Sequence, residues 1–162
     1  MNVRDYIDID LGCQRLRLLQ AGDSVFEAPV STATNGPGEI RDSERTPRGW
    51  HEICEKIGAA APVNTVFVGR KPTGELYTPE LRKQYPQRDW ILTRILWLNG
   101  LEPGRNRRGA VDSRDRYIYI HGCPADVGMG TPGSHGCIRM RNERIIDLFN
   151  RVHVGTRVFI HE

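Results

Sequence analysis

The chain has 162 residues, which is enough for one sizeable core, and we expect a single domain over residues 1–162. Its formal net charge of +3 comes from 23 basic and 20 acidic side chains that are interspersed along the sequence. Without a long basic run or a known helix or finger motif, nucleic-acid binding is not expected. No apolar run approaches the ~20 residues of a membrane span.

The residues near the start and the cysteine content bear on the cellular compartment. Met1 leads directly into an alternating strand pattern, without an apolar leader or a cleavage site. The four cysteines do not form a disulfide-framework pattern. Both observations favour the reducing cytoplasm, and a periplasmic location is the alternative if a leader has been removed.

Most of the chain alternates apolar and polar residues with the period of two that is typical of strands. In chain order, strands are predicted at 6–11, 14–19, 25–32, 50–57, 91–98, 117–121 and 157–160. Turns are predicted at 12–13, 21–24, 35–38 and 46–49 from their glycines, prolines and small polar residues. The polar segment 69–86 is predicted as a long loop or cap with at most one short helix near 79–84, and 102–115 as a loop.

Two elements carry specific expectations. The clearest helix is 142–152, with Asn142 as the N-cap and an apolar stripe formed by Ile145, Ile146, Leu148, Phe149 and Val152. In the strand 117–121, alternation places Ile118 and Ile120 toward the core. The opposite face, with Tyr117, Tyr119 and His121, is then expected to border a cleft.

The most informative segment is Ser134-His135-Gly136-Cys137-Ile138-Arg139-Met140, with His121-Gly122 upstream. A cysteine becomes a strong nucleophile when an imidazole takes its proton, which makes Cys137 the expected nucleophile and His121 its general base. A glycine-rich turn lets a scissile carbonyl approach backbone N–H groups that hold an oxyanion. The segment therefore predicts acyl transfer through a thioester.

Neighbouring residues receive supporting roles. No carboxylate is an obvious orienting partner for His121, so a backbone carbonyl is the candidate. Arg139, two residues beyond the nucleophile, is interpreted as a clamp for a substrate carboxylate rather than a solvated charge. Tyr119 and Ser134 are assigned to substrate binding, and the Ser134 hydroxyl is expected to stabilise the turn rather than act as a nucleophile. Cys123 is expected to be a structural neighbour.

A metal site is the alternative interpretation of the same residues. His121-x-Cys123 and His135-x-Cys137 supply enough ligands for tetrahedral zinc. One intervening residue on a strand gives poor convergence, however, so neither a metal nor another cofactor is expected.

The motif from His121 to Arg139 resembles the signature of YkuD-type L,D-transpeptidase catalytic domains. That signature is a histidine followed by Ser/Thr-His-Gly-Cys, an apolar residue and Asn or Arg. Gln14-Arg15-Leu16, Val30-Ser31-Thr32 and Thr46-Pro47-Arg48-Gly49 follow the family in order. Many relatives have Thr where this chain has Cys123.

The resemblance implies a mainly β fold of two packed mixed sheets with few helices. It also implies that the Cys137 thiol attacks the L-to-D bond between the third stem residue of peptidoglycan, usually meso-diaminopimelate, and D-alanine at position four. The carbonyl of Gly122 would orient His121, and His135 with the amides of Gly136 and Cys137 would line the oxyanion site. The implied partners are peptidoglycan stem peptides or muropeptides.

We therefore expect a cytoplasmic L,D-carboxypeptidase that converts tetrapeptides to tripeptides in murein recycling. One alternative is an exported L,D-transpeptidase that forms 3-3 crosslinks or exchanges D-amino acids. Another is a non-catalytic, zinc-stabilised module that binds stem peptides.

Overall fold

The computed structural model describes residues 4–162. Its strands are β1 (Tyr6–Asp10), β2 (Arg15–Gln20), β3 (Asp23–Pro29), β4 (Gly49–Ile57), β5 (Thr65–Val68), β6 (Lys71–Leu76), β7 (Ile91–Gly100), β8 (Tyr119–Gly122), β9 (Ile138–Met140) and β10 (Arg157–His161). Its α-helices are α1 (Pro79–Gln84) and α2 (Asn142–Arg151), and a 3₁₀ turn covers Gly109–Val111. No helix in residues 4–162 has the length and apolar character needed to cross a bilayer.

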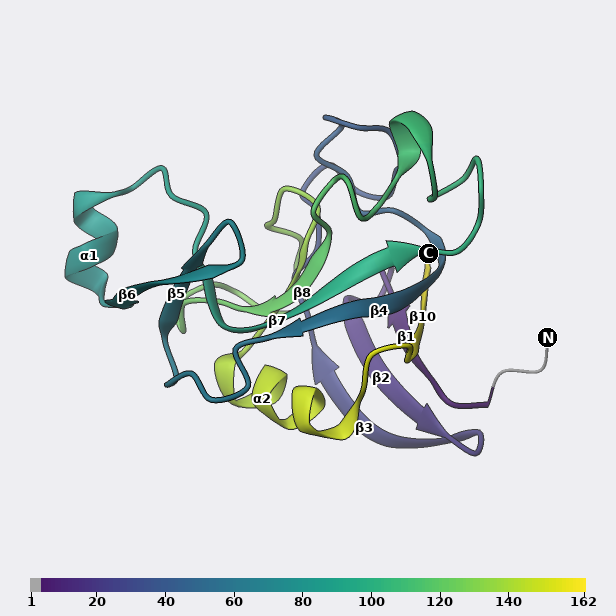
Figure 1. The fold of residues 1–162 in the computed structure, drawn as a ribbon, viewed down its shortest axis with the longest axis horizontal. Coiled ribbons are helices and arrows are strands. Elements are labelled where there is room, and N and C mark those ends of the chain that lie inside the picture. Colours follow the sequence, from purple (N-terminus) through teal and green to yellow (C-terminus); the bar gives the residue numbers. More distant parts are fainter. Residues whose placement is uncertain (1–3) are drawn as a thin grey trace.

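The strands form a mixed sheet in the order β3-β2-β1-β10-β4-β7-β5-β6, with β8 paired to β7 and β9 paired to β8. The β1–β10 and β8–β9 pairs are parallel, and the other pairs are antiparallel. This confirms the predicted mainly β, mixed-sheet class. Strand β7 joins the branches of the sheet, because it pairs with β4, β5 and β8 (Figure 1).

The main core lies where α2 packs against β7 and β8. Ile118 and Ile120 are buried in this core, as the alternation of their segment predicts. From α2, Ile145, Leu148 and Phe149 point into the same core, while Ile146 is only partly buried. The β8 end that carries the motif histidine is therefore fixed by apolar packing, which supplies most of the rigidity a site needs.

Two details of these elements differ from the prediction. β8 begins at Tyr119 rather than Tyr117, because Tyr117 has a φ of 56° that no extended strand accommodates. The N-cap position of α2 is Arg141, without a side-chain capping bond. Asn142 is buried instead, where it accepts a hydrogen bond from Thr93 Oγ1 and donates one to Asn64 Oδ1.

The segment predicted as a loop over 69–86 contains most of a hairpin that the sequence analysis missed. Val68 and Lys71 pair across a two-residue turn between β5 and β6, and α1 follows at the predicted position. Pro72 and Gly74 lie within β6 and give it the composition of a loop. Because β6 is at the end of the sheet order, it tolerates a proline that a central strand would exclude.

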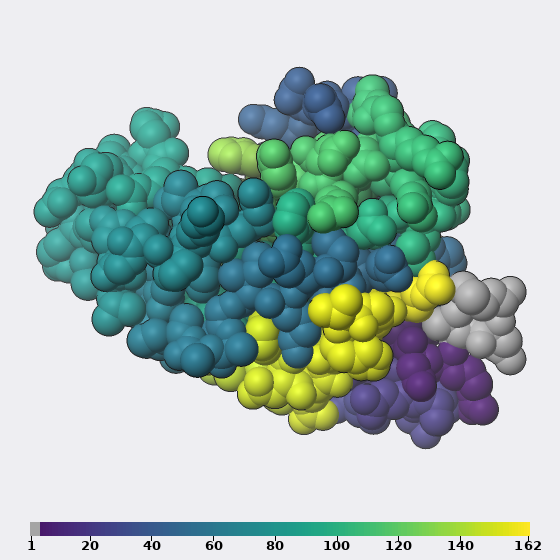
Figure 2. Space-filling model, viewed as in Figure 1, coloured from purple at the N-terminus to yellow at the C-terminus, as the bar shows by residue number. Residues whose placement is uncertain are grey.

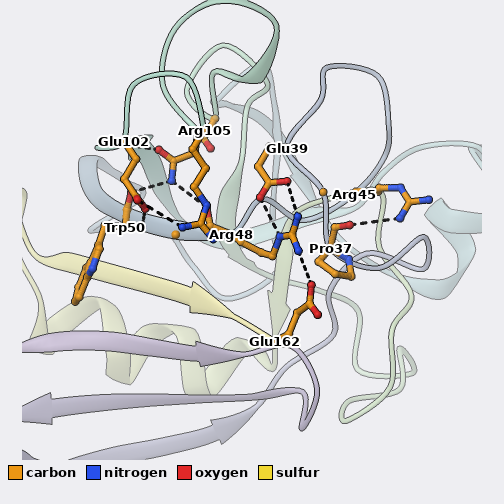
Figure 3. A network of polar contacts seen from close by, with 12 residues as sticks. Pro37, Glu39, Arg45, Arg48, Trp50, Glu102, Arg105 and Glu162 are labelled. Carbon is orange, nitrogen blue, oxygen red and sulfur yellow. Dashed lines mark hydrogen bonds and ion pairs between the residues drawn. The ribbon is translucent and has the colours of Figure 1, made fainter.

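Two long loops are tied to β4 and to the end of the chain by polar contacts (Figure 3). Arg48 Nε lies 2.9 Å from Glu39 Oε1, and Arg48 Nη1 lies 2.6 Å from Glu162 Oε1. The Trp50 amide donates to Glu102 Oε2 at 2.7 Å. The loops 36–48 and 101–107 are therefore held at defined positions although they carry little regular structure.

A buried histidine fastens the segment that follows the second of these loops. His51 is fully buried, with Nδ1 3.0 Å from the carbonyl oxygen of Gly49 and Nε2 2.8 Å from Ser113 Oγ. A neutral ring satisfies both contacts, since Nδ1–H donates and Nε2 accepts from the hydroxyl. Burial accordingly lowers the pKa of His51 from 6.5 to about 4.

We expect His51 to make folding stability depend on pH. Because its folded pKa lies below the ordinary 6.5, its contribution is complete above pH 6.5 and is lost as the pH falls toward about 4. The shift corresponds to roughly 3 kcal/mol. Urea unfolding between pH 4 and 7 should show a steeper loss of stability in wild type than in His51→Gln. Equal pH dependence in the two proteins would contradict this role.

Candidate active site

Cys137 lies in the turn directly before β9 and contacts the start of β8. The Tyr119 amide donates to Cys137 Sγ at 3.4 Å, and the thiol donates to the Tyr117 carbonyl oxygen, also at 3.4 Å. Cys137 borders an open cleft of about 540 Å³. The cleft is also lined by Arg70, Asp89, Arg116, Tyr119 and His135.

A second hollow of about 550 Å³ adjoins this cleft and shares Arg116, Tyr117 and His135 with it. Figure 2 shows the surface hollowed between the teal lobe of β5, β6 and α1 and the blue and green loops, with yellow-green chain at its base. The nucleophile turn therefore faces a continuous depression that is open to an extended ligand on both sides.

The parallel pairing of β8 with β9 brings the strand that carries His121 beside the turn that carries Cys137. His121 pairs with Arg139 across the ladder, and Cys137 precedes Arg139 by two residues. Since directly paired residues project to one face, the side chains of Arg139 and His121 lie on the same face of this ribbon. The sequence alone had not shown this pairing, because β9 is only Ile138–Met140 and was not predicted as a strand.

The orientation of the His121 ring follows from one short contact. Its Nδ1 lies 2.6 Å from the carbonyl oxygen of Gly122, the partner that the family resemblance implied. Nδ1–H is the donor, so Nε2 of the neutral ring carries a free lone pair. Nε2 is buried and has no hydrogen-bond partner within residues 4–162. The ring thus holds an unused proton acceptor. His121 is fully buried and is not among the residues that line the cleft, contrary to the prediction from the alternation of 117–121, whereas Tyr117 and Tyr119 do line it.

Gly122 itself is required by close packing at this point. A Cβ added there would lie 2.3 Å from Asn142 Oδ1 and 2.6 Å from the carbonyl oxygen of Leu92. Any larger residue would displace β8 or the start of α2. The carbonyl that orients His121 is therefore fixed in place by the core around it.

Electrostatics leave both members of the pair uncharged at rest. Burial raises the pKa of the Cys137 thiol to about 12, although the Tyr119 amide and the nearby Arg139 and Arg116 favour the thiolate. Burial also lowers the pKa of His121. A neutral thiol can donate a proton and a neutral imidazole can accept one.

The turn before Cys137 is held by two hydroxyl groups. Ser134 Oγ donates to the Cys137 carbonyl oxygen at 2.6 Å and accepts from the Gly136 amide at 3.2 Å. Thr46 Oγ1 donates to the Gly136 carbonyl oxygen at 2.9 Å. Gly136 has a φ of 132°, a conformation that residues with a Cβ rarely adopt.

These contacts bear on two predictions from the sequence. Ser134 is buried and both of its bonds lie within the turn, as predicted for its hydroxyl, and it is not among the residues that line the cleft. The Gly136 amide is already engaged by Ser134 and is not a free oxyanion donor. No hydrogen bond to the Cys137 amide is found within the described chain, which leaves this N–H as the better candidate.

Arg139 is also engaged by the protein itself. Its Nη1 donates to the Gly133 carbonyl oxygen at 2.9 Å, and its Nη2 lies 3.2 Å from Asp89 Oδ1. Only 16% of the side chain is exposed. To bind a substrate carboxylate, Arg139 would have to give up these contacts. In this structure its side chain orders the nucleophile turn.

The remaining predicted residues divide between the cleft and the core. Tyr119 and His135 border the cleft. Cys123 is buried, donates from Sγ to the Met140 carbonyl oxygen at 3.2 Å, and has a pKa raised to about 11 by burial. Cys123 is thus a structural neighbour of the site, as expected.

The residues of the alternative zinc site do not converge. Among residues 4–162, no group of three or more His, Cys, Asp or Glu side chains lies within reach of one metal ion. His121 uses Nδ1 on Gly122, and Cys123 Sγ donates to Met140. Both side chains are thus engaged by backbone carbonyl groups.

Three charged residues that line the cleft were not predicted from the sequence: Arg70, Asp89 and Arg116. Arg70 lies in the unpredicted β5–β6 turn, and Asp89 and Arg116 lie outside the motif. Arg116 donates to the carbonyl oxygens of Gly38, Glu39 and Arg45, which fastens the 36–46 loop beside the site. No sequence signal places these residues near Cys137, because only long-range contacts bring them there.

Comparisons with known proteins agree with this geometry. The family model "YkuD: L,D-transpeptidase catalytic domain" matches residues 4–160. The chain is 30% identical over 162 residues to the probable L,D-transpeptidase ErfK/SrfK of Salmonella typhimurium, covering 98% of this chain and 44% of the relative. It is 37% identical over 112 residues to the probable L,D-transpeptidase YbiS of Escherichia coli, covering 66% of this chain and 35% of that protein.

The fold is also found among solved structures. L,D-transpeptidase 3 from Mycobacterium tuberculosis, in complex with a faropenem-derived adduct, aligns with a TM-score of 0.58 at 15% identity. The alignment covers 98% of this chain and 60% of that structure.

The chain belongs to the YkuD L,D-transpeptidase catalytic-domain family. It spans less than half the length of the two curated relatives described above.

We predict that Ser134→Ala destabilises the nucleophile turn, whereas Ser134→Thr is tolerated. Alanine removes both hydroxyl contacts and leaves the buried Gly136 amide unpaired, which costs about 1–3 kcal/mol. Threonine keeps the hydroxyl. Urea unfolding, together with the rate at which iodoacetamide alkylates Cys137, would measure both effects. If Ser134→Ala matched wild type in both measurements, the turn would not depend on this side chain.

Proposed function

We propose that this chain is a cysteine-dependent acyl enzyme that cleaves the bond between the third, L-centred residue of a peptidoglycan stem and the D-alanine that follows. Membership of the L,D-transpeptidase family supports the reaction class. The single observation that carries the proposal is the buried, unpartnered Nε2 of His121, two residues along β8 from the Tyr119 amide that contacts the Cys137 thiol. A structural histidine would have both ring nitrogens satisfied, as His51 does.

In the proposed reaction, His121 Nε2 takes the proton of the Cys137 thiol as the sulfur attacks the scissile carbonyl carbon. The tetrahedral oxyanion is held by the Cys137 amide, with His135 at the same edge of the cleft. The C–N bond then breaks, and the amine of D-alanine leaves with the proton from His121. The stem peptide remains as a thioester on Cys137.

We propose that water is the acceptor that resolves this thioester. His121 accepts a proton from the water as it attacks the thioester, and the Cys137 thiol leaves with a proton returned by the imidazole. The products are a tripeptide stem with a free carboxylate and free D-alanine, as for an L,D-carboxypeptidase in murein recycling. The alternative is attack by an amine, which would give a crosslink or an exchanged D-amino acid.

The proposed compartment is the cytoplasm, where soluble muropeptides are substrates and polymeric acceptor strands are absent. Cys13 is an exposed free thiol, which suits a reducing environment. An exported enzyme acting on the assembled wall is the alternative.

We expect Cys137→Ala to abolish D-alanine release from a purified tetrapeptide muropeptide, because the sulfur is the acyl carrier. His121→Ala should lower kcat/KM by at least about 10²–10⁴-fold, the usual value of a general base. Mass spectrometry of reactions with and without added D-amino acid separates hydrolysis from exchange. Cys123→Ala is the matched control and should retain activity; turnover by Cys137→Ala would refute the mechanism.

We also expect native, untagged protein to fractionate with the cytoplasm. Cells that lack it should accumulate tetrapeptide muropeptides in their soluble fraction, with unchanged 3-3 crosslinks in the wall. Recovery of the protein in the periplasm, or loss of 3-3 crosslinks on deletion, would favour the exported transpeptidase instead.

A further inference from the structure

Arg70 is placed at the mouth of the Cys137 cleft by an unusual turn. It follows Gly69 in the two-residue connection between β5 and β6, where both residues have positive φ, 56° and 65°. Such hairpin turns favour glycine or asparagine, because a Cβ strains the left-handed conformation. An arginine at this position costs turn stability, and such outliers are concentrated at functional sites.

The guanidinium of Arg70 is held above an aromatic platform. It lies 4.7 Å from the ring centroid of Trp97 and 4.9 Å from that of Tyr117. Its Nη1 donates to the Tyr119 hydroxyl at 3.1 Å, the only hydrogen bond found for this side chain within residues 4–162. Four of the five N–H donors of the guanidinium are therefore available, and its position is fixed before any ligand binds.

An acidic group lines the same cleft. Asp89 borders it together with Arg70 and Cys137, and its side chain is 44% exposed. One oxygen, Oδ1, lies 3.2 Å from Arg139 Nη2, and Oδ2 has no hydrogen bond within the described residues. Arg70 and Asp89 form no ion pair with each other. The cleft thus presents a fixed cation and a separate anion beside the nucleophile.

We propose that Arg70 and Asp89 bind an amino-acid zwitterion on the acyl donor, with Arg70 taking the carboxylate and Asp89 the ammonium. Arginine is suited to carboxylates because its planar fork forms two parallel hydrogen bonds. The assignment rests on the proposed function, in which the third stem residue is acylated on Cys137. The free end of a diaminopimelate side chain carries this zwitterion, so the pair selects for diaminopimelate at that position.

Three synthetic tetrapeptides separate the two contacts. They differ only at the third residue, which is meso-diaminopimelate, lysine or 2-aminopimelate. Lysine keeps the side-chain ammonium and lacks the carboxylate, whereas 2-aminopimelate keeps the carboxylate and lacks the ammonium. The measured quantity is kcat/KM for release of D-alanine by the full chain.

Arg70→Asn removes the guanidinium while keeping a residue that tolerates the left-handed turn. We expect kcat/KM for the diaminopimelate peptide to fall about ten- to a hundredfold, since a charge-assisted contact is lost, with little change for the lysine peptide. The kcat/KM of Arg70→Lys for the diaminopimelate peptide should lie between the values of wild type and Arg70→Asn. Asp89→Asn should lower kcat/KM for the diaminopimelate peptide by roughly five-fold, a modest factor because the carboxylate is partly exposed. The preference for the diaminopimelate peptide over the 2-aminopimelate peptide should then disappear.

Arg114→Asn is the matched control, because Arg114 lies 5.1 Å from the same Trp97 ring and does not line the cleft. It should leave all three rates unchanged. Equal iodoacetamide alkylation of Cys137 in every variant shows that the nucleophile turn is intact. If Arg70→Asn keeps the wild-type ratio of diaminopimelate to lysine turnover, the assignment is overturned and the proposed function stands. If wild type cleaves none of the peptides, the proposed function fails and the assignment fails with it.

Discussion

The site depends on the parallel pairing of β8 with β9. This short ladder aligns His121 with Arg139 and thereby brings the turn with Cys137 against the start of β8. On the side of β9 away from β8, the backbone of Arg139 pairs with Ser31. The Ser31 amide donates to the Arg139 carbonyl oxygen at 3.0 Å, and the Arg139 amide donates to the Ser31 carbonyl oxygen at 2.9 Å. Neither strand would be stable alone at this length, so the pairing relies on β7 and α2 packing behind it.

Around this ladder, polar contacts order segments that have little regular structure. Thr46 fastens one loop to the nucleophile turn, Arg116 binds carbonyl groups of the same loop, and His51 with Ser113 fastens the next. Loops of this kind line the open cleft and leave backbone groups free for a ligand. The rigid sheet therefore positions the reacting pair, while the anchored loops define the surface that a substrate meets.

Burial acts on both Cys137 and His121. It raises the pKa of the thiol and lowers the pKa of the imidazole, so it favours the neutral form of each group. The cleft that Cys137 borders is also lined by the side chains of Arg70 and Asp89.

From local signals in the sequence, the mainly β class of the fold and the burial of Ile118 and Ile120 could be predicted, and the structure confirms both. The motif from His121 to Cys137 and the turn-stabilising role of the Ser134 hydroxyl are also local signals, and the motif named the candidate reacting residues. The engagement of Arg139 by Asp89 and the position of Arg70 at the cleft follow only from the folded chain. These outcomes depend on which distant segments meet, and the periodicity of residues along a chain carries no record of such contacts.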